Sequence, residues 1–313
     1  MWHYSAAEAR VQQSGRVVET HGKFHRVWDG ERILQAFPGG RLALSRNRAK
    51  NLIAIGDRVR LRPQDDGTAL IESVEERANA VMRRLSFSGA EQVIAANVDV
   101  LAVMLAPNPV LNTGLLDRTL VEGSRIGVPA AILVNKMDLL SRREVRRTLT
   151  PYEALGFPIH LLCAKRGEGV EEFLAAVRGR WVLLLGHSGV GKTTLVNRVA
   201  PGLDRTVGEV DPTRGKGRHT TSNAYAHGLA DGTFLVDTAG IREFGLAGMG
   251  WRDVERAFPE IHAAREGCRF QDCRHLAEPR CAVRSAAEEG SIHPARYESY
   301  LTLLREVEGQ GRG

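Results

Sequence analysis

The feature that most constrains the fold is an eight-residue loop, GHSGVGKT, at residues 186–193. It follows an apolar run, Trp181–Leu185, and precedes a segment with helical spacing that ends at Val199. A strand, a glycine-rich turn and a helix in this order form the phosphate-binding loop. A chance match in a glycine-rich chain is the alternative, and the flanking strand and helix argue against it. We therefore expect an α/β domain that binds a nucleotide.

The residue types of this loop predict how phosphate is held. Glycines let backbone N–H groups converge on the phosphates, and the helix N-terminus adds partial positive charge. We expect Lys192 to reach the β and γ phosphates and the Thr193 hydroxyl to coordinate Mg²⁺. The predicted phosphate site comprises Gly186, His187, Ser188, Gly189, Val190, Gly191, Lys192, Thr193 and Thr194.

A second motif, Asn135-Lys136-Met137-Asp138, follows the apolar run Ala130–Val134 and resembles the NKxD guanine motif. A carboxylate at Asp138 can accept from both the ring N–H and the exocyclic amine of guanine, whereas adenine offers neither donor there. The alternative is that Asn135 and Asp138 cap the next helix. Beside the phosphate loop, the motif predicts selection of GTP.

Cys163-Ala164-Lys165, at the end of the predicted strand Ile159–Cys163, resembles the SAK element that closes over a guanine base. Cys163 stands where serine is usual. Since backbone N–H groups carry most of this contact, we expect the substitution to be tolerated. Of the nucleotide motifs it is the least specific.

The triphosphate-sensing element is predicted at Asp237-Thr238-Ala239-Gly240, after the strand Phe234–Val236. This segment matches D-x-x-G, in which Asp237 holds Mg²⁺ and the N–H of Gly240 senses the γ-phosphate. A simple strand-to-turn sequence is the alternative.

A polar, glycine-bearing segment, Thr213–Ser222, lies between the phosphate loop and D-x-x-G, as a switch segment does. We expect Thr220, or alternatively Thr221, to reach Mg²⁺. Ile241 occupies the position where many GTPases carry a water-orienting glutamine. His219 is our candidate for this catalytic role, and a surface histidine is the alternative.

A metal site is predicted near the C-terminus by the pattern Cys268-x4-Cys273-x-His275-x5-Cys281. Three thiolates and one imidazole form a closed tetrahedral set, which suits structural zinc rather than catalysis. The alternative is reduced cysteines in a small core. Nearby arginines suggest contact with nucleic acid: Arg269, Arg274, Arg280 and Arg284.

The first 80 or so residues contain short alternating segments separated by turns at Asp29-Gly30, Gly39-Gly40 and Asp66-Gly67. This spacing predicts a small β-barrel or sandwich. The predicted strands are Gly15–Glu19, Phe24–Trp28, Arg32–Phe37, Ile55–Leu61 and Ala69–Val74. A basic stripe between Arg41 and Arg62, interrupted by one acid, Asp57, either follows nucleic-acid phosphates or is a solvated barrel face.

From about Val98, apolar strands alternate with amphipathic helices, as in a doubly wound α/β domain. After Gly250 only helical stretches are expected, ending in a helix around Pro294–Glu308. The sequence therefore predicts three domains: a barrel at 1–80, a nucleotide-binding domain at 81–250 and a metal-binding module at 251–313.

The net charge and the lack of long apolar runs restrict the binding partners and the cellular location that we expect. The 313 residues carry a net charge of +6, which favours an acidic partner such as nucleic acid. The start of the chain lacks the layout of a signal peptide, and no apolar run reaches the roughly 18 residues that cross a bilayer. We expect a cytoplasmic protein without a membrane partner.

The order of the motifs is unusual, because the guanine motif precedes the phosphate loop whereas GTPases usually have the reverse. This is a circular permutation. Together with the predicted barrel and Cys-Cys-His-Cys module, it resembles the RsgA/YjeQ family of small-subunit-dependent GTPases over nearly the whole chain. The segment Val93–Asp99 also resembles the family's lead-in to the first GTPase strand.

The resemblance implies several properties that composition and spacing do not give. These are an OB-fold barrel, zinc as the metal, and the small ribosomal subunit and its rRNA as partners. It also implies a role in late subunit maturation, with hydrolysis stimulated by the subunit and coupled to release. Separately, we expect the protein to be a monomer. Departures from the family pattern are Cys163, Thr193-Thr194 where serines are common, and Ala239 where proline is common.

Two other interpretations stay open from the sequence. An RNA-binding assembly module could use GTP as a conformational ligand with negligible hydrolysis, which the missing glutamine permits. An adenylate-type kinase or ATPase would share the phosphate loop but has no use for Asn135 and Asp138.

Overall fold

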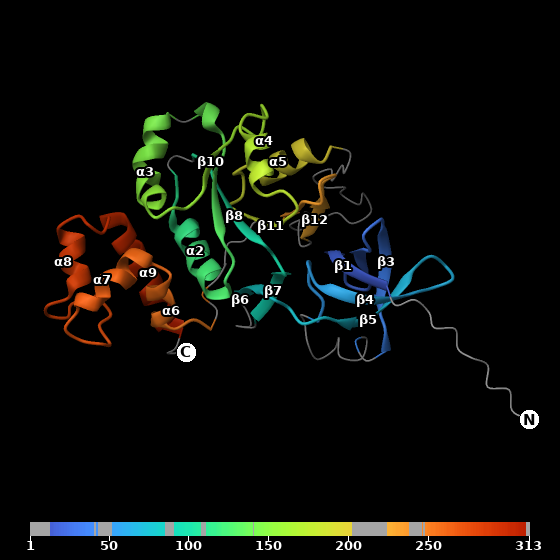
Figure 1. Ribbon diagram of the computed structural model, residues 1–313, viewed down its shortest axis with the longest axis horizontal. Helices are drawn as coiled ribbons and strands as arrows, with labels where there is room; N and C mark the ends of the chain where they lie inside the picture. Colours follow the sequence, from blue (N-terminus) through green and yellow to red (C-terminus); the bar gives the residue numbers. More distant parts are fainter. Residues whose placement is uncertain are drawn as a thin grey trace, which may run out of the picture.

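The computed structural model describes residues 13–40, 42, 52–84, 91–107, 111–139, 141–201, 224–237, 246 and 248–310. The barrel lies at one end and the C-terminal helices at the other, with an α/β sheet between them (Figure 1). Within the described ranges, no helix has the length and apolar character needed to span a bilayer. Thr213–Ser222, with His219, Thr220 and Thr221, and also Thr238, Ala239, Gly240 and Ile241, lie outside these ranges.

The N-terminal strands form a closed five-stranded barrel, as the sequence predicts. Neighbours run in the order β1-β2-β3-β5-β4, and β4 pairs back with β1. The interior is apolar because alternate residues point inward, among them Val17, Val27, Val59 and Leu61. The strands are β1 (Gln13–Thr20), β2 (His25–Trp28), β3 (Ile33–Pro38), β4 (Arg58–Pro63) and β5 (Ala69–Val74).

Part of the predicted basic stripe is neutralised by carboxylates. On β4, Arg60 and Arg62 form ion pairs with Glu75 and Glu72 at 3.8 and 3.0 Å. Asp57 is fully buried and pairs with Arg77 at 2.7 Å. Arg41, Arg46, Arg48 and Lys50 lie outside the described residues.

The central domain is a sheet with strand order β10-β9-β8-β11-β13-β12, in which only β12 runs antiparallel. Along β8, alternate residues enter two separate cores: Leu101 and Val103 on one face, Ala102 and Met104 on the other. Both faces are therefore covered, as in a doubly wound fold. The strands are β8 (Val100–Leu105), β9 (Ala130–Val134), β10 (Ile159–Leu161), β11 (Trp181–Leu185), β12 (Tyr225–Gly228) and β13 (Phe234–Asp237).

The helices of this domain follow the strands in the expected alternation. A capping box between Ser141 and Glu144 starts α3, a helix that the sequence analysis did not anticipate. The helical elements are α2 (Gly114–Ile126), η1 (Met137–Leu139), α3 (Arg142–Ala154), α4 (Val170–Ala176) and α5 (Lys192–Val199).

The barrel joins the central sheet through its own first strand. β1 pairs antiparallel with β12, with Glu19 opposite Tyr225, so one sheet runs through both units. Beside this junction the Phe234 ring lies between Trp28 and Trp181, with ring centroids 5.0 and 4.4 Å away. A separate hairpin of β6 (Ala80–Arg84) and β7 (Glu91–Ala96), which was not predicted, links the barrel to β8.

The hairpin approaches the barrel so closely that Gly56 is required. Gly56 has φ +86, and a Cβ there would meet the carbonyl oxygen of Ala96 at 1.9 Å. No larger residue fits this turn without moving β7.

Beyond Gly250 the described chain is helical, as predicted, and packs around its own core of residues such as Phe258, Ile261 and Tyr300. Its last helix covers the predicted Pro294–Glu308. The elements are α6 (Trp251–Arg256), α7 (Pro259–Ala264), η2 (Arg265–Gly267), α8 (Ala282–Glu288) and α9 (Pro294–Gln310).

This C-terminal module is joined to the central domain by buried charges. Arg296 of α9 contacts Asp117 of α2, and its Nε donates to Glu260 Oε1 at 2.7 Å. Asp117 also accepts from the hydroxyls of Tyr152 and Ser299. Arg296 and Asp117 are each 1% exposed, so this contact is buried in the interface.

Candidate nucleotide site and metal centre

The predicted nucleotide residues gather at one edge of the sheet. The parallel strands β8, β9, β10, β11 and β13 share a direction, so their carboxyl ends meet there. Asn135 follows β9, Cys163 follows β10, Gly186 follows β11 and Asp237 ends β13. Ligands bind at this edge in open α/β sheets, so the fold brings together motifs that are far apart in the chain.

Asn135 connects the phosphate loop to the base loop. Its side-chain Nδ2 donates to the Val190 carbonyl at 2.8 Å, and its Oδ1 accepts from the Ala164 N–H at 2.9 Å. The side chain is 2% exposed, so both bonds form away from water. Gly191 makes this contact sterically feasible, since a Cβ there would lie 2.2 Å from Asn135 Nδ2. Sequence reasoning placed Asn135 at the base but missed this connecting role.

Asp138 lies exposed on η1 beside the Cys163 thiol. Cys163 Sγ donates to Asp138 Oδ1 at 3.3 Å, and this bond lowers the pKa of the Asp138 carboxyl. The carboxyl is thus held in its ionised, accepting form, as recognition of two guanine N–H groups requires. Cys163 therefore supplies a side-chain donor, a role that the sequence analysis, which assigned most of this element's contact to backbone N–H groups, did not predict. Lys136 adopts φ 62, and Lys165 is exposed.

Lys192, the first residue of α5, is buried beneath the phosphate loop. Its Nζ donates to the Gly186 carbonyl at 2.7 Å and to the His187 carbonyl at 3.3 Å. Burial lowers the pKa of Lys192, and the charge of Asp237 opposes that shift. The ammonium thus sits inside the loop, while Thr193 and Thr194 are exposed on the first turn of α5.

Gly186 allows the phosphate loop to pass close to the strand beside it. A Cβ on Gly186 would meet the Met104 carbonyl at 2.7 Å and a Val190 methyl at 2.8 Å. His187, Ser188 and Gly189 are exposed at the tip of the loop. The backbone there is accessible to an anion, as the motif requires.

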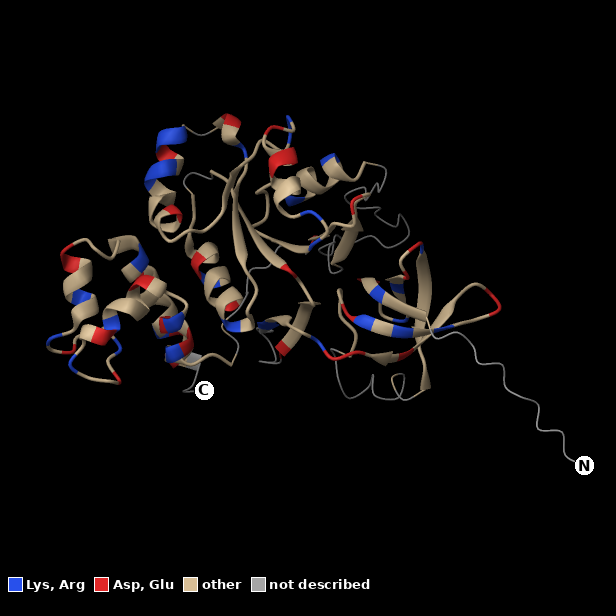
Figure 2. Ribbon diagram, viewed as in Figure 1, with Lys and Arg blue, Asp and Glu red and all other residues tan. Residues whose placement is uncertain are grey.

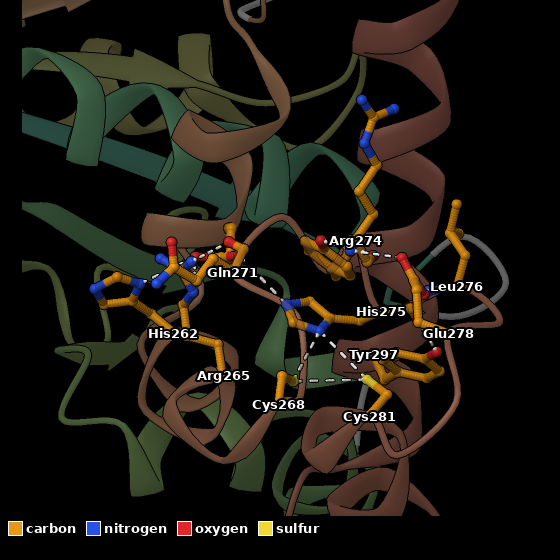
Figure 3. Close-up of polar contacts among 12 residues, drawn as sticks. His262, Arg265, Cys268, Gln271, Arg274, His275, Leu276, Glu278, Cys281 and Tyr297 are labelled. Carbon is orange, nitrogen blue, oxygen red and sulfur yellow. Dashed lines mark hydrogen bonds and ion pairs between the residues drawn. The ribbon is translucent and has the colours of Figure 1, made fainter.

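The four predicted metal ligands also come together. The ligand atoms of Cys268, Cys273, His275 and Cys281 all lie within 4.8 Å of one another. Figure 3 shows the His275 ring directed at Cys268 and Cys281, with Nδ1 3.6 and 3.4 Å from their sulfurs. Sulfurs on a tetrahedral zinc with bonds of about 2.3 Å lie about 3.8 Å apart. The Cys268 and Cys281 sulfurs are 3.9 Å apart, so the set fits such an ion.

The protonation chemistry of this cluster also suits a cation. Burial raises the pKa of the Cys273 thiol to about 12 and also raises that of Cys281. A bound divalent cation offsets this effect by deprotonating the thiols. Burial lowers the pKa of His275 and so favours the neutral imidazole that ligates metals.

Glu255, a residue that sequence reasoning missed, orients the ligand histidine from the far side. Its Oε2 lies 3.3 Å from His275 Nε2, which leaves Nδ1 to face the thiols. The carboxylate is 1% exposed and also contacts His262 and Arg265, at 3.2 and 3.3 Å. Because Glu255 precedes His275 by 20 residues, no spacing rule in the sequence would have found it.

Comparison with known proteins agrees with this arrangement. The sequence profile described as RsgA GTPase matches residues 74–247. The chain belongs to the RsgA GTPase family. It is therefore a GTPase, and the predicted permuted domain, barrel and cysteine-histidine module are confirmed at the level of fold.

Relatives named small ribosomal subunit biogenesis GTPase RsgA extend the match over nearly the full length. The protein of Gemmatimonas aurantiaca is 39% identical over 304 residues, covering 96% of this chain and 97% of the relative. That of Bacteroides fragilis is 35% identical over 300 residues, covering 94% and 97%.

Solved structures give the same architecture. YjeQ from Thermotoga maritima is 29% identical with a TM-score of 0.74, covering 96% of this chain and 99% of that one. YloQ, described as a circularly permuted GTPase, is 22% identical with a TM-score of 0.70 over 99% of both chains, and it supports the fold alone.

Proposed function

We propose that this RsgA-family GTPase binds the small ribosomal subunit and assists its late maturation, with hydrolysis stimulated by the subunit and coupled to release. The names of the near full-length relatives support the choice of partner. The observation that carries the GTP-dependent part is the double hydrogen bond of Asn135. It holds the base loop and the phosphate loop together although the chain presents them in permuted order.

In this proposal each motif keeps the role that its chemistry predicts. Asp138 reads guanine together with Asn135, Lys136 and the Cys163–Lys165 element. Lys192 neutralises the β and γ phosphates, and Thr193 and Asp237 hold Mg²⁺. We also assign Thr220 to Mg²⁺, Gly240 to the γ-phosphate and His219 to the attacking water, from sequence alone.

The metal centre is proposed to be structural. One Zn²⁺ held by Cys268, Cys273, His275 and Cys281 would leave no open coordination position and would fold the C-terminal module. We propose three working units, 1–80, 81–250 and 251–313, acting as a cytoplasmic monomer that contacts rRNA. The chain enters the C-terminal module directly after Asp237–Gly240, so loss of a γ-phosphate contact can be passed to that module.

The test is multiple-turnover phosphate release from GTP with small subunits, with large subunits and without ribosomes. We expect stimulation by small subunits alone. Lys192→Ala should abolish it, because the ammonium that meets the phosphates is lost. Equal rates under all three conditions would favour an RNA-binding module that uses GTP as a conformational ligand.

Base selection is tested separately with Asp138→Asn. An amide presents a donor where guanine also presents one, so GTP affinity should fall while affinity for xanthosine triphosphate rises. The control is Cys163→Ser, which replaces the thiol donor beside Asp138 with a hydroxyl donor and should bind GTP almost normally. Unchanged GTP binding by Asp138→Asn would remove this residue from the base site.

A further inference from the structure

Helix α3 carries a group of basic residues near its N-terminal end, which colour the ribbon blue there (Figure 2). All four are exposed arginines within the first two turns, and they are Arg142, Arg143, Arg146 and Arg147. The single acid among them, Glu144, closes the capping box with Ser141 and so already has a structural role. These arginines follow the guanine motif in sequence and belong to none of the predicted RNA-binding surfaces.

Most other arginines in the described chain have a carboxylate within 4.0 Å, whereas these four have none, and only Arg147 feels the charge of an acid on its own helix, Glu144. Arg60 and Arg62 in the barrel and Arg274 in the C-terminal module each have a carboxylate within 4.0 Å. Within the described ranges, no ion pair joins any α3 arginine to an acid. Their positive field is therefore available to a partner.

A groove lies directly beside this charge. It has a volume of about 550 Å³ and runs between α3 and β10, the edge strand of the central sheet. Its floor is apolar: Val145 and Leu149 come from the helix, and Ile159 and Leu161 from the strand. Three arginines, Arg142, Arg143 and Arg146, and one acid, Glu153, line the same groove, so a net positive charge and apolar groups face one space.

We propose that this groove, which we call the α3 groove, binds single-stranded RNA. The guanidinium groups contact phosphates, for which their planar donor fork is suited, and an unstacked base lies on the apolar floor. Arg142 and Arg146 are four residues apart, so they stand one helical turn, about 6 Å, from each other along the axis. That spacing lets both arginines follow one strand.

RNA fits these features better than an acidic protein does. Single strands combine regularly spaced phosphates with flat apolar faces, and proteins that bind them pair basic grooves with surfaces on which bases lie. The net charge of +6 further favours a polyanion. The identity of this RNA as ribosomal rests on the proposed function, but binding of RNA by the groove does not.

The test uses a fluorescein-labelled oligouridine of twelve nucleotides and measures its dissociation constant by anisotropy at several salt concentrations. The variant Arg142→Gln/Arg146→Gln should bind at least tenfold more weakly. The slope of log K against log salt should become shallower by about 1.4, because each phosphate contact on a single strand contributes about 0.7.

The matched control is Arg178→Gln/Arg305→Gln, which removes the same charge from two exposed arginines away from the groove. It should bind oligouridine within twofold of the wild type, and both variants should bind GTP normally. Equal weakening in the two variants would overturn the proposal, because bulk charge alone would then explain the binding.

Two further probes test separately whether a base contacts the apolar floor and whether the ligand is RNA rather than an acidic protein. An abasic oligomer of the same length should bind several-fold more weakly to the wild type, and equal binding would overturn the role of the apolar floor. Poly-glutamate of matched charge should compete poorly, whereas competition as strong as that of RNA would point to an acidic protein instead. Stimulation of hydrolysis by small subunits, measured in parallel, reports on the proposed function independently.

Discussion

The barrel and the C-terminal module are both attached to the central domain, but through different chemistry. The barrel shares a backbone ladder through β1 and β12 and packs aromatic rings around Phe234. The C-terminal module meets α2 through the buried Asp117–Arg296 contact, and its own core includes the four side chains of the proposed zinc site. Strand pairing and ring packing involve no charge, whereas a buried ion pair needs both partners and clustered thiolates need a cation.

This difference indicates which end of the molecule changes its structural order when salt or metal concentration changes. Apolar packing and strand pairing vary little with salt or metal, so we expect the barrel to keep its position. In the proposed zinc site a cation offsets the charge of the thiolates, and at the interface with α2 the buried charge of Asp117 needs Arg296 as its partner. We therefore expect this module to be the one whose order depends on metal.

The largest expected effect comes from removing a metal ligand. Cys273→Ser should lose zinc, and the segment beyond Gly250 should lose order because a small module depends on its metal. Metal analysis and limited proteolysis measure the two steps. The control, Cys163→Ser, removes a cysteine outside the cluster and should retain both the bound zinc and the resistance to protease. A protease-resistant, metal-free Cys273→Ser protein would show that the order of the C-terminal module does not depend on metal.

The next effect comes from the interface itself. Arg296→Met leaves Asp117 buried and unpaired, which should destabilise the C-terminal module by about 3–5 kcal/mol. Hydrogen exchange across α9 measures this loss. The double variant Arg296→Met/Asp117→Leu removes both charges of this pair and should recover much of the loss, since apolar replacements of buried pairs are often tolerated. Failure of this recovery would show that other polar contacts of the pair dominate the interface, namely Glu260 with Arg296 or the hydroxyls with Asp117.

A smaller effect is expected at Glu255. Glu255→Gln keeps the shape but removes the charge that orients His275, so zinc affinity should fall about 10- to 100-fold. Competition with a chelator measures the affinity, and the cobalt-substituted spectrum should still indicate tetrahedral ligation. Glu266→Gln, an exposed neighbour on η2, should change neither property.

The smallest effect is expected on the barrel side. Trp28→Ala removes one face of the packing on Phe234 and should lower the free energy of unfolding by about 1–2 kcal/mol. Urea unfolding at low and high salt measures this loss, and it should be nearly the same at both. Trp28→Phe keeps a ring and should recover most of the stability. The Arg16 guanidinium lies 3.6 Å from the centre of the Trp181 ring. A strongly salt-dependent loss would mean that this cation, rather than the ring packing, stabilises the contact between the barrel and the central sheet.

Local patterns were sufficient to predict much of this architecture. The barrel strands, the parallel strands and the metal ligands were predicted because alternation, apolar runs and ligand chemistry are readable over short spans. Helix α3 was not predicted because its many arginines leave few apolar positions to show helical spacing, and because Pro151 lies inside it. The hairpin of β6 and β7 was missed because its two strands carry mixed polar and apolar residues.

What the sequence could not predict depends on contacts between distant residues. Asp117 and Arg296 are 179 positions apart, and each looks like an ordinary surface residue of a helix. Glu255 behind His275 has no motif. In the site, residue types predicted which side chains bind nucleotide, but not that the amide of Asn135 hydrogen-bonds to the backbone of Val190 and Ala164.

This hydrogen bonding has a kinetic consequence for nucleotide exchange. Asn135 fixes the spacing of the two loops in the protein itself, so an incoming nucleotide meets a pocket whose halves are already aligned. Because the loops are aligned beforehand, they lose less conformational entropy when nucleotide binds. We therefore expect labelled GDP to associate in a single fast phase. Asn135→Asp places a carboxylate oxygen against the Val190 carbonyl and should introduce a slow second phase, which stopped-flow fluorescence would resolve.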